Sequence, residues 1–192
     1  MRVSIHSCLS KPVIPVVWDL SENSLDLSSA NAVFLQGGEV SDLPQILAQF
    51  DAEPLRHLAI FVHLELLDGL ESNEAGVHWL AGFPRCAGII TVRHRLVPAV
   101  RKHEMLSIIR LFLHDGRSVE RGVSMMNQAK PDAVEVLPAI AATVAGGSLE
   151  ALRVPLIAGG LIKDMQVLQA ALKSGCRAVS TSKQQLWQLN DL

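Results

Sequence analysis

Two stretches near the end of the chain decide the fold: Val154-Pro-Leu-Ile-Ala-Gly-Gly-Leu-Ile162 and Cys176-Arg-Ala-Val-Ser-Thr-Ser182. Each is a short apolar run that ends in small or hydroxylic residues and leads into a helical pattern. An apolar run without polar alternation predicts a strand that is buried on both faces, as in a parallel sheet covered by helices. The two stretches are separated by the length of one strand–helix unit, so they predict consecutive strands of an α/β fold.

The residues at the ends of these two strands form a candidate phosphate site. Glycine lets the backbone turn closely, and N–H groups at a helix start attract anions without any basic side chain. In a (β/α)8 barrel, the loops after strands seven and eight frequently hold phosphate. We therefore interpret Gly159, Gly160, Ser180, Thr181 and Ser182 as a phosphate cradle. The alternative is structural: the glycines make a tight turn and the hydroxyls cap the last helix.

The rest of the chain repeats the pattern of a strand followed by a helix. Strand signals occur at 13–17, 32–36, 58–64, 88–91, 106–113, 133–137, 154–158 and 176–182. Helical patterns occur at 41–50, 73–80, 96–103, 118–129, 139–152, 164–172 and from 183 onward, whereas 21–31 is short and polar. The glycines at 146 and 147 are a candidate break in one helix. Eight such units predict a compact (β/α)8 TIM-type barrel of parallel strands, formed by residues 1–192 as a single domain.

Polar residues lie at the carboxyl ends of the predicted strands, which would bring them together at one mouth of the barrel. They are Asp19, His63, Glu65, Arg93, Arg110 and Glu135. Carboxylates opposite a bound phosphate suit a ligand with hydroxyl groups at its other end, and either arginine can pair with phosphate or with the acids. The alternative is an internal salt-bridge network, Arg110 with Glu135 or Glu65, that holds the barrel closed without a ligand.

Composition excludes several classes of protein. No run of eighteen apolar residues occurs among the 192, and the start lacks a signal-peptide pattern, so we expect a cytoplasmic protein without membrane contact. Cys8, Cys86 and Cys176 are far apart and form no C-x-x-C pair, which predicts buried, reduced thiols. His63 and Glu65 share a strand face but lack a third ligand with diagnostic spacing. We therefore expect no metal and no cofactor.

Several segments, in order through almost the entire chain, resemble the glycerol-3-phosphate-responsive antiterminators of bacterial glycerol operons. They are Phe61–Leu70, Gly88–Thr91, Arg110–Leu113, Pro131–Pro138, Pro155–Ile162 and Ala178–Lys183 with Leu186-Trp187. The resemblance implies a barrel that binds glycerol-3-phosphate and then acts on leader mRNA, suppressing a terminator. It implies that Gly159, Gly160, Thr181 and Ser182 hold the phosphate. It also matches His63, Glu65, Arg110 and Glu135 to polar positions at the family's strand ends.

The uneven charge suits contact with RNA on one face. Residues 93–121 hold seven basic and three acidic residues, a net charge of +4, whereas the rest of the chain holds ten basic and sixteen acidic ones. Ordinary solvated helix faces are the alternative. The candidate RNA surface consists of Arg95, Arg101, Lys102, Arg117 and Arg121. With no Tyr and three Trp, we expect contacts to RNA backbone and shape rather than base stacking.

The preferred interpretation is a non-enzymatic switch that binds a small phosphate ester and then contacts RNA, without catalytic residues. The sequence does not decide whether the chain forms a homo-oligomer. The competing interpretation is an aldolase- or isomerase-type enzyme acting on a small phosphorylated substrate, since this fold supports many chemistries. A Schiff-base lysine would then lie within a strand, and the strand cores contain Arg110 but no lysine. Glu with His could still transfer protons.

Overall fold

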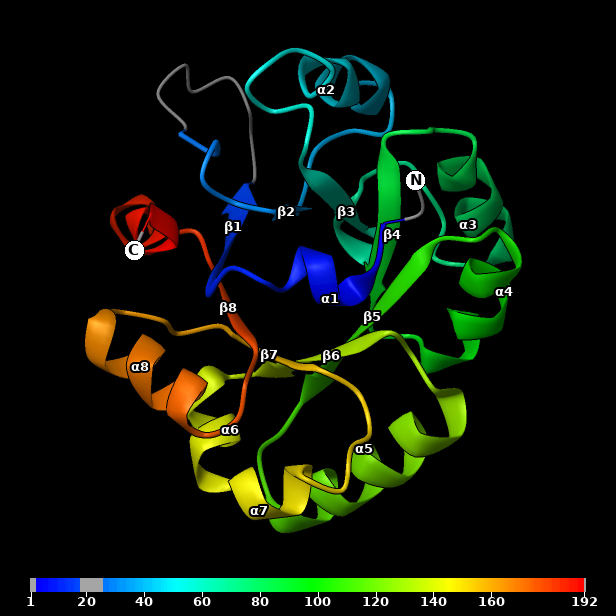
Figure 1. The fold of residues 1–192 in the computed structure, drawn as a ribbon. Coiled ribbons are helices and arrows are strands. Elements are labelled where there is room, and N and C mark those ends of the chain that lie inside the picture. Colours follow the sequence, from blue (N-terminus) through cyan, green and yellow to red (C-terminus); the bar gives the residue numbers. More distant parts are fainter. Residues whose placement is uncertain (1–2, 18–25, 192) are drawn as a thin grey trace.

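Eight parallel strands form a closed barrel in the order of the sequence, and the last strand pairs with the first (Figure 1). The structure, a computed structural model, describes residues 3–17 and 26–191. The strands are β1 (Val13–Val17), β2 (Ala32–Leu35), β3 (Ala59–His63), β4 (Cys86–Thr91), β5 (Leu106–Phe112), β6 (Ala133–Leu137), β7 (Leu156–Gly159) and β8 (Ala178–Thr181). The predicted (β/α)8 TIM-type barrel is confirmed.

Strand residues alternate between the barrel interior and the surrounding helices. Ile14, Phe34 and Phe61 pack inside the barrel, and the rings of the two phenylalanines meet edge to face with centroids 5.8 Å apart. Val33 and Ile60 point the other way, into the layer between strands and helices. Both faces of each strand are therefore buried, which is why continuous apolar runs in the sequence located them.

The interior leaves no room for a side chain at Gly88 of β4. A Cβ added there would lie 2.4 Å from the carbonyl oxygen of Leu106 and 2.6 Å from the ring of Phe61. The glycine lets the Phe61 ring fill this part of the barrel, so the interior is a packed core rather than a channel.

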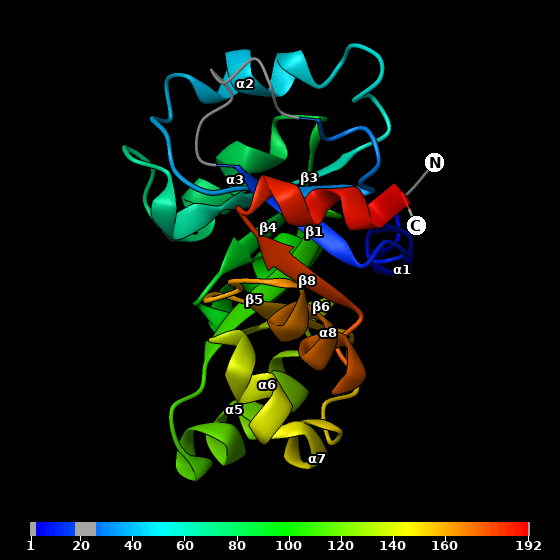
Figure 2. The ribbon, with the colours of Figure 1, turned by 90° about the vertical axis from the view of Figure 1, so that its left-hand side faces the viewer.

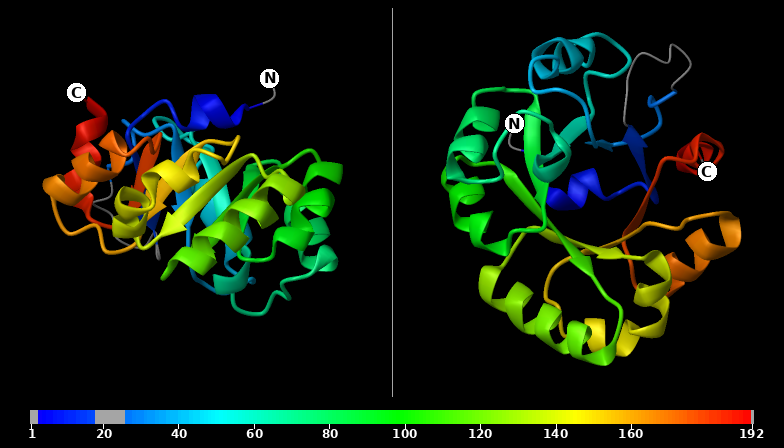
Figure 3. Two further views of the ribbon diagram at one scale, coloured as in Figure 1. Left: turned by 90° about the horizontal axis from the view of Figure 1, so that it is seen from below. Right: turned by 180° about the vertical axis from the view of Figure 1, so that it is seen from behind.

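Helices surround the barrel on its outside (Figures 1 and 3). The α-helices after the strands are α2 (Leu43–Gln49), α3 (Glu74–Ala81), α4 (Val97–Lys102), α5 (Gly116–Ala129), α6 (Ala139–Val144), α7 (Gly146–Leu149) and α8 (Met165–Lys173). The 3-10 helices are η1 (Leu64–Leu66), η2 (His94–Leu96) and η3 (Gln184–Asp191). All of these helices except α5 have nine residues or fewer, which is how eight units fit into 192 residues.

The structure confirms the candidate helix break at the two glycines, and it differs from the prediction in the closing segment. The helix predicted at 139–152 is divided into α6 and α7 at Ala145, next to the two glycines. The closing segment is a 3-10 helix rather than an α-helix. Residues 26–31 contain no helix, and the rest of the polar stretch at 21–31 lies outside the described residues. Among the described residues, no helix is long and apolar enough to cross a membrane.

The sequence patterns did not indicate α1 (Ile5–Cys8), a single turn that precedes β1. Ile5, Cys8 and the following Leu9 pack into the same interior cluster as Ile14 of β1. In Figures 1 and 2 this helix lies across the end of the barrel from which the strands start. It closes that end, so the polar residues at the carboxyl ends of the strands surround the other mouth.

Candidate functional site

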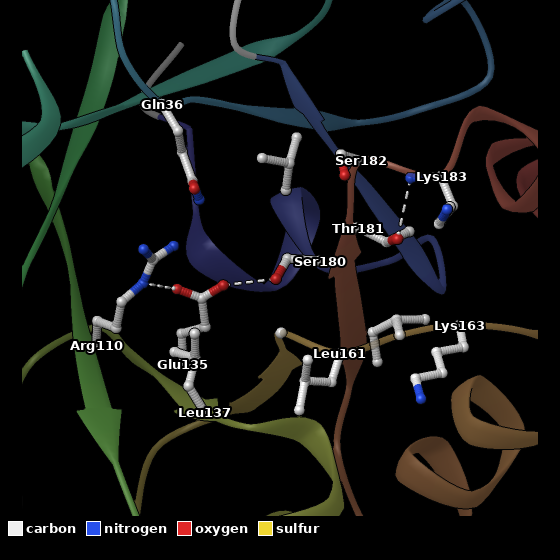
Figure 4. Close-up of a pocket in the computed structure, with 13 residues that line it drawn as sticks. Gln36, Arg110, Glu135, Leu137, Leu161, Lys163, Ser180, Thr181, Ser182 and Lys183 are labelled. Atoms are coloured by element: carbon white, nitrogen blue, oxygen red, sulfur yellow. Dashed lines mark hydrogen bonds and ion pairs between the residues drawn. The ribbon is translucent and has the colours of Figure 1, made fainter.

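A pocket of about 470 Å³ opens at the carboxyl ends of the strands (Figure 4). The ends of β1, β2, β5, β6 and β8 and the loops after β7 and β8 contribute to it. Its lining consists of Val16, Gln36, Arg110, Glu135, Leu137, Gly160, Leu161, Ile162, Lys163, Ser180, Thr181, Ser182 and Lys183. A volume of this size is in the range of small-molecule sites.

Glu135 of β6 carries the buried charge of the pocket, with 1% of its surface exposed. Arg110 of β5 is its register partner, and the guanidinium Nε donates to Glu135 Oε2 at 2.7 Å. The hydroxyl of Ser180 on β8 donates to the other carboxylate oxygen (Figure 4). The two charges that the sequence placed inside strands thus pair with each other, as the salt-bridge alternative expected, and Arg110 does not pair with Glu65.

Gly159 at the end of β7 makes room for this carboxylate. A Cβ added to Gly159 would lie 2.5 Å from Glu135 Oε1 and 2.6 Å from the Ser180 hydroxyl oxygen. Gly159 and Ser180 are register partners on β7 and β8, and the carboxylate occupies the space beside both. Gly159 is therefore not among the residues that line the pocket, although it was predicted to hold phosphate.

The loops after β7 and β8 leave the barrel from paired positions and line the same pocket. Gly160 adopts φ +73, in the left-handed region that favours glycine. Thr181 serves the local structure, because its hydroxyl accepts the N–H of Lys183 at 3.1 Å and its carbonyl accepts the indole N–H of Trp187 at 2.8 Å. Ser182 is exposed at the rim. The Thr181 hydroxyl therefore shapes the turn before η3, while Gly160 and Ser182 line the pocket.

Three polar residues of the pocket were not predicted: Gln36, Lys163 and Lys183. Both lysines are exposed, and among the described residues neither ammonium group pairs with a carboxylate. Lys183 directly follows the hydroxylic end of β8, and Lys163 follows the glycine turn, so their positions were a usable signal. Gln36 follows β2, and Figure 4 shows its amide directed toward Arg110 and Glu135.

A second polar cluster lies near the same mouth but does not line the pocket. Glu65 of η1 accepts a hydrogen bond from the Thr91 hydroxyl, and its Oε1 lies 3.7 Å from Arg93 Nε. His63 Nδ1 is 3.5 Å from Glu65 Oε2. Only 3% of His63 is exposed, and neither ring nitrogen has a hydrogen-bond partner within the described chain.

The environment of His63 keeps its ring neutral. Burial, together with the positive charge of Arg110, lowers the pKa of His63 from 6.5 to about 3. Arg110 thus connects the two clusters electrostatically. The predicted polar residues are divided between them, with Arg110 and Glu135 in the pocket and His63, Glu65 and Arg93 beside it. Asp19, the remaining member, lies outside the described residues.

The basic residues of the predicted RNA surface are all exposed and lie on the outside of the barrel. They are Arg95 of η2, Arg101 and Lys102 of α4, and Arg117 and Arg121 of α5. Arg101 also has a structural contact, because its Nη2 donates to the carbonyl of Lys130 at 2.6 Å, just after α5. The set extends along the length of α4 and the first half of α5 rather than forming one compact cluster.

The three cysteines have the environment that their spacing predicted. Cys8, Cys86 and Cys176 are free and buried, and burial raises the pKa of the Cys8 thiol to about 11 and of the Cys86 thiol to about 12. These thiols are unreactive at neutral pH. Within the described part of the chain, no group of three or more His, Cys, Asp or Glu side chains is placed to hold a metal ion.

Fold and pocket together define a class: a (β/α)8 barrel with a pocket of small-molecule size, in which the loops after strands seven and eight each contribute a lysine. The sequence profile of the glycerol-3-phosphate responsive antiterminator family matches residues 13–187. The chain belongs to this family of regulators, as the resemblance implied. It is also 33% identical over 186 residues to the uncharacterized protein YgcP of Escherichia coli, with 96% of each chain covered.

Solved structures agree with this assignment. The glycerol uptake operon antiterminator regulatory protein of Listeria monocytogenes has a TM-score of 0.81 and 27% identity, over 92% of this chain and 95% of that one. A glycerol uptake operon antiterminator-related protein of Thermotoga maritima has a TM-score of 0.81 and 26% identity, over 93% and 98%. A deoxyribose phosphate aldolase of Aeropyrum pernix, with a TM-score of 0.68 and 12% identity, shares the fold alone.

Proposed function

We propose that the protein is a cytoplasmic, non-enzymatic sensor that binds glycerol-3-phosphate in the barrel pocket and then binds leader mRNA, preventing transcription termination of glycerol-utilisation genes. The observation that carries this proposal is the charge of the pocket. Arg110 is neutralised by Glu135, whereas Lys163 and Lys183 at the rim have no carboxylate partner among the described residues. These two lysines therefore give the edge of the pocket a positive charge that can bind an anion.

The phosphate group would lie between the two loops. Main-chain N–H groups near Gly160 and Ser182 would donate to it, and the two lysines would supply positive charge. Gly159 and Ser180 would act one layer below, by holding Glu135 in place. The glycerol hydroxyls would face Arg110 and Glu135, with His63, Glu65 and Arg93 as a supporting layer behind them.

The RNA would contact the basic residues on the outer helices. Binding of glycerol-3-phosphate would tether the loops after β7 and β8. If the ligand binds the RNA-binding conformation more tightly than the inactive one, it shifts the equilibrium toward the RNA-binding conformation. The proposed contacts are those of the basic surface, namely Arg95, Arg101, Lys102, Arg117 and Arg121.

Thermal unfolding tests the ligand site. We expect glycerol-3-phosphate to raise the melting temperature most, inorganic phosphate less and glycerol not at all. Lys163→Met and Lys183→Met should each weaken binding by about tenfold to a hundredfold, because a charge-assisted hydrogen bond contributes about 1.5 to 3 kcal/mol. Lys173→Met, on the exposed end of α8, is the matched control and should bind normally. A melting temperature that no phosphate ester raises would exclude the sensor.

An aldolase- or isomerase-type enzyme is the second candidate, and the two pocket lysines favour it. A lysine that forms a Schiff base with a triose phosphate would be trapped covalently by borohydride, with a defined mass increase. We expect no trapping and no turnover, because both lysines lie on exposed loops rather than in the desolvated setting that activates an amine. A trapped adduct on either lysine would favour the enzyme instead.

A further inference from the structure

We propose that the Arg110–Glu135 pair makes the pocket selective for a phosphate ester whose other end carries hydroxyl groups, and against one whose other end carries a carboxylate. This inference rests on the proposed function, since it assumes that the phosphate end lies at Lys163 and Lys183. It adds a specificity determinant: the pair distinguishes a polyol phosphate from a phosphorylated acid of nearly the same size.

The bonding of Glu135 determines what a ligand can offer it. Arg110 Nε donates to Oε2 at 2.7 Å and the Ser180 hydroxyl donates to Oε1, so the carboxylate acts as an acceptor at both oxygens. A carboxylate has about four lone-pair sites, which leaves acceptor capacity at each oxygen. Because Glu135 lines the pocket and is 99% buried, a ligand group in contact with it has to donate a hydrogen bond. A hydroxyl can donate, whereas a ligand carboxylate cannot.

The position of Glu135 is held from three sides, so it cannot turn away from an unsuitable ligand. Gly159 leaves the space that the carboxylate fills, with an added Cβ only 2.5 Å from Oε1. Arg110 is fixed opposite it by the register of β5 and β6, and Ser180 approaches from β8. Two carboxylates in this poorly solvated space would repel each other, since like charges interact strongly at low dielectric.

The same geometry predicts how selectivity changes when the charge is removed. Glu135→Gln keeps the size of the side chain and gives the pocket an N–H donor, while Arg110 loses the charge that neutralises it. A ligand carboxylate would then find two donors and no repulsion. A ligand hydroxyl would lose a charged acceptor, which is equivalent to about a tenfold to hundredfold loss of affinity for a bond to a charged group.

The test compares the dissociation constants of three ligands by calorimetry: glycerol-3-phosphate, 3-phosphoglycerate and inorganic phosphate. We expect the native protein to prefer glycerol-3-phosphate to 3-phosphoglycerate by at least tenfold. Glu135→Gln should abolish or reverse this preference, and inorganic phosphate should still bind, because Lys163 and Lys183 are retained. Glu150→Gln, the same substitution at an exposed site just after α7, is the matched control and should keep the native preference.

Arg110→Gln gives an independent check if Glu135→Gln does not fold. It leaves Glu135 without its neutralising partner, so the preference for glycerol-3-phosphate over 3-phosphoglycerate should increase rather than decrease. Equal affinities for the two esters in the native protein, or a native preference in both variants, would overturn the inference while leaving the sensor intact. If the native protein binds neither ester nor inorganic phosphate, the proposed function fails together with it.

Discussion

At the scale of single residues, Glu135 dictates which neighbours are tolerated around it. Gly159 is the clearest case, because an added methyl group would overlap both the carboxylate and the Ser180 hydroxyl. Gly159→Ala should lower the free energy of unfolding by about 1 to 3 kcal/mol, the usual effect of overpacking. Urea denaturation measures this loss. The control is Gly147→Ala on α7, where nothing lies within 4 Å and stability should not fall.

Gly160 should matter for the ligand rather than for the carboxylate. Gly160→Asp places a negative charge at the rim and forces a non-glycine residue into φ +73, so phosphate binding should be lost. Gly175→Asp carries the same charge and also requires a positive φ, +98, in the turn between α8 and β8, away from the pocket. The two variants should be destabilised similarly, and only Gly160→Asp should lose its thermal shift with glycerol-3-phosphate. A normal shift in Gly160→Asp would remove this loop from the site.

His63 should make stability depend on pH. In the unfolded chain it takes up a proton below about pH 6.5, whereas in the folded protein, where its pKa is lowered to about 3, it stays neutral. Acid therefore favours the unfolded state, and stability falls as the pH drops from 6.5 toward 3. Between pH 7 and pH 5 the loss attributable to His63 is about 2 kcal/mol. It should be absent in His63→Gln, and equal pH profiles of the two proteins would contradict the buried neutral ring.

The sequence predicted individual polar residues well where a charge interrupted an apolar strand. Arg110 and Glu135 stood out for this reason, and they proved to be partners. The sequence does not reveal the role of a residue when that role depends on contacts between neighbouring strands. Gly159, which was predicted to hold phosphate, makes room for Glu135, and this close approach is visible only once β6, β7 and β8 are side by side.

At the scale of elements, periodicity located every strand, because strands buried on both faces are continuous apolar runs. It missed α1, since four residues cannot display a helical period. The break that the two glycines predicted in one helix is present, at Ala145 between α6 and α7. Short elements held in place by tertiary packing leave little trace in local sequence, and α1 is held by Ile5 and Cys8 inside the barrel.

The cap of α1 gives a prediction for this element alone. Ser4 accepts the N–H of Ser7 at 3.1 Å in a reciprocal capping box, and such a cap contributes about 1 kcal/mol. Ser4→Ala should therefore loosen α1 and increase the rate at which a thiol reagent modifies Cys8. Cys86 and Cys176 in the same molecule are internal controls whose rates should not change. Peptide mass spectrometry separates the three sites, and a rise at all of them would indicate general destabilisation instead.

At the scale of the whole molecule, eight strand–helix units in sequence order are enough to predict a closed parallel barrel. The location of the mouth also follows, because parallel strands end on the same side. The precise shape of the pocket does not, since the two lysines reach it from the loops before α8 and η3, whose course local sequence patterns do not give.

The proposed RNA surface is tested by measuring RNA binding and ligand binding separately in the same variant. Arg117→Glu with Arg121→Glu reverses two charges on α5, so leader RNA binding should fall by at least tenfold, with a weaker dependence on salt. The thermal shift with glycerol-3-phosphate should remain, because neither residue lines the pocket. Lys173→Glu with Arg177→Glu, an equal charge change on and after α8, should bind RNA normally. Unchanged RNA affinity in the α5 variant would exclude this surface.

The closure of one barrel end by α1 bears on how long a ligand would stay bound in the pocket. Because the barrel interior is packed and α1 closes the opposite end, the described residues leave the pocket open only at the carboxyl ends of the strands, and a molecule bound over this opening would trap a ligand in the pocket. An RNA bound over the pocket opening would slow ligand dissociation. An RNA bound to the outer helices would not change the dissociation rate, provided that the two binding sites are not otherwise coupled. Effector off-rates measured with and without transcript therefore reveal where on the barrel the transcript sits.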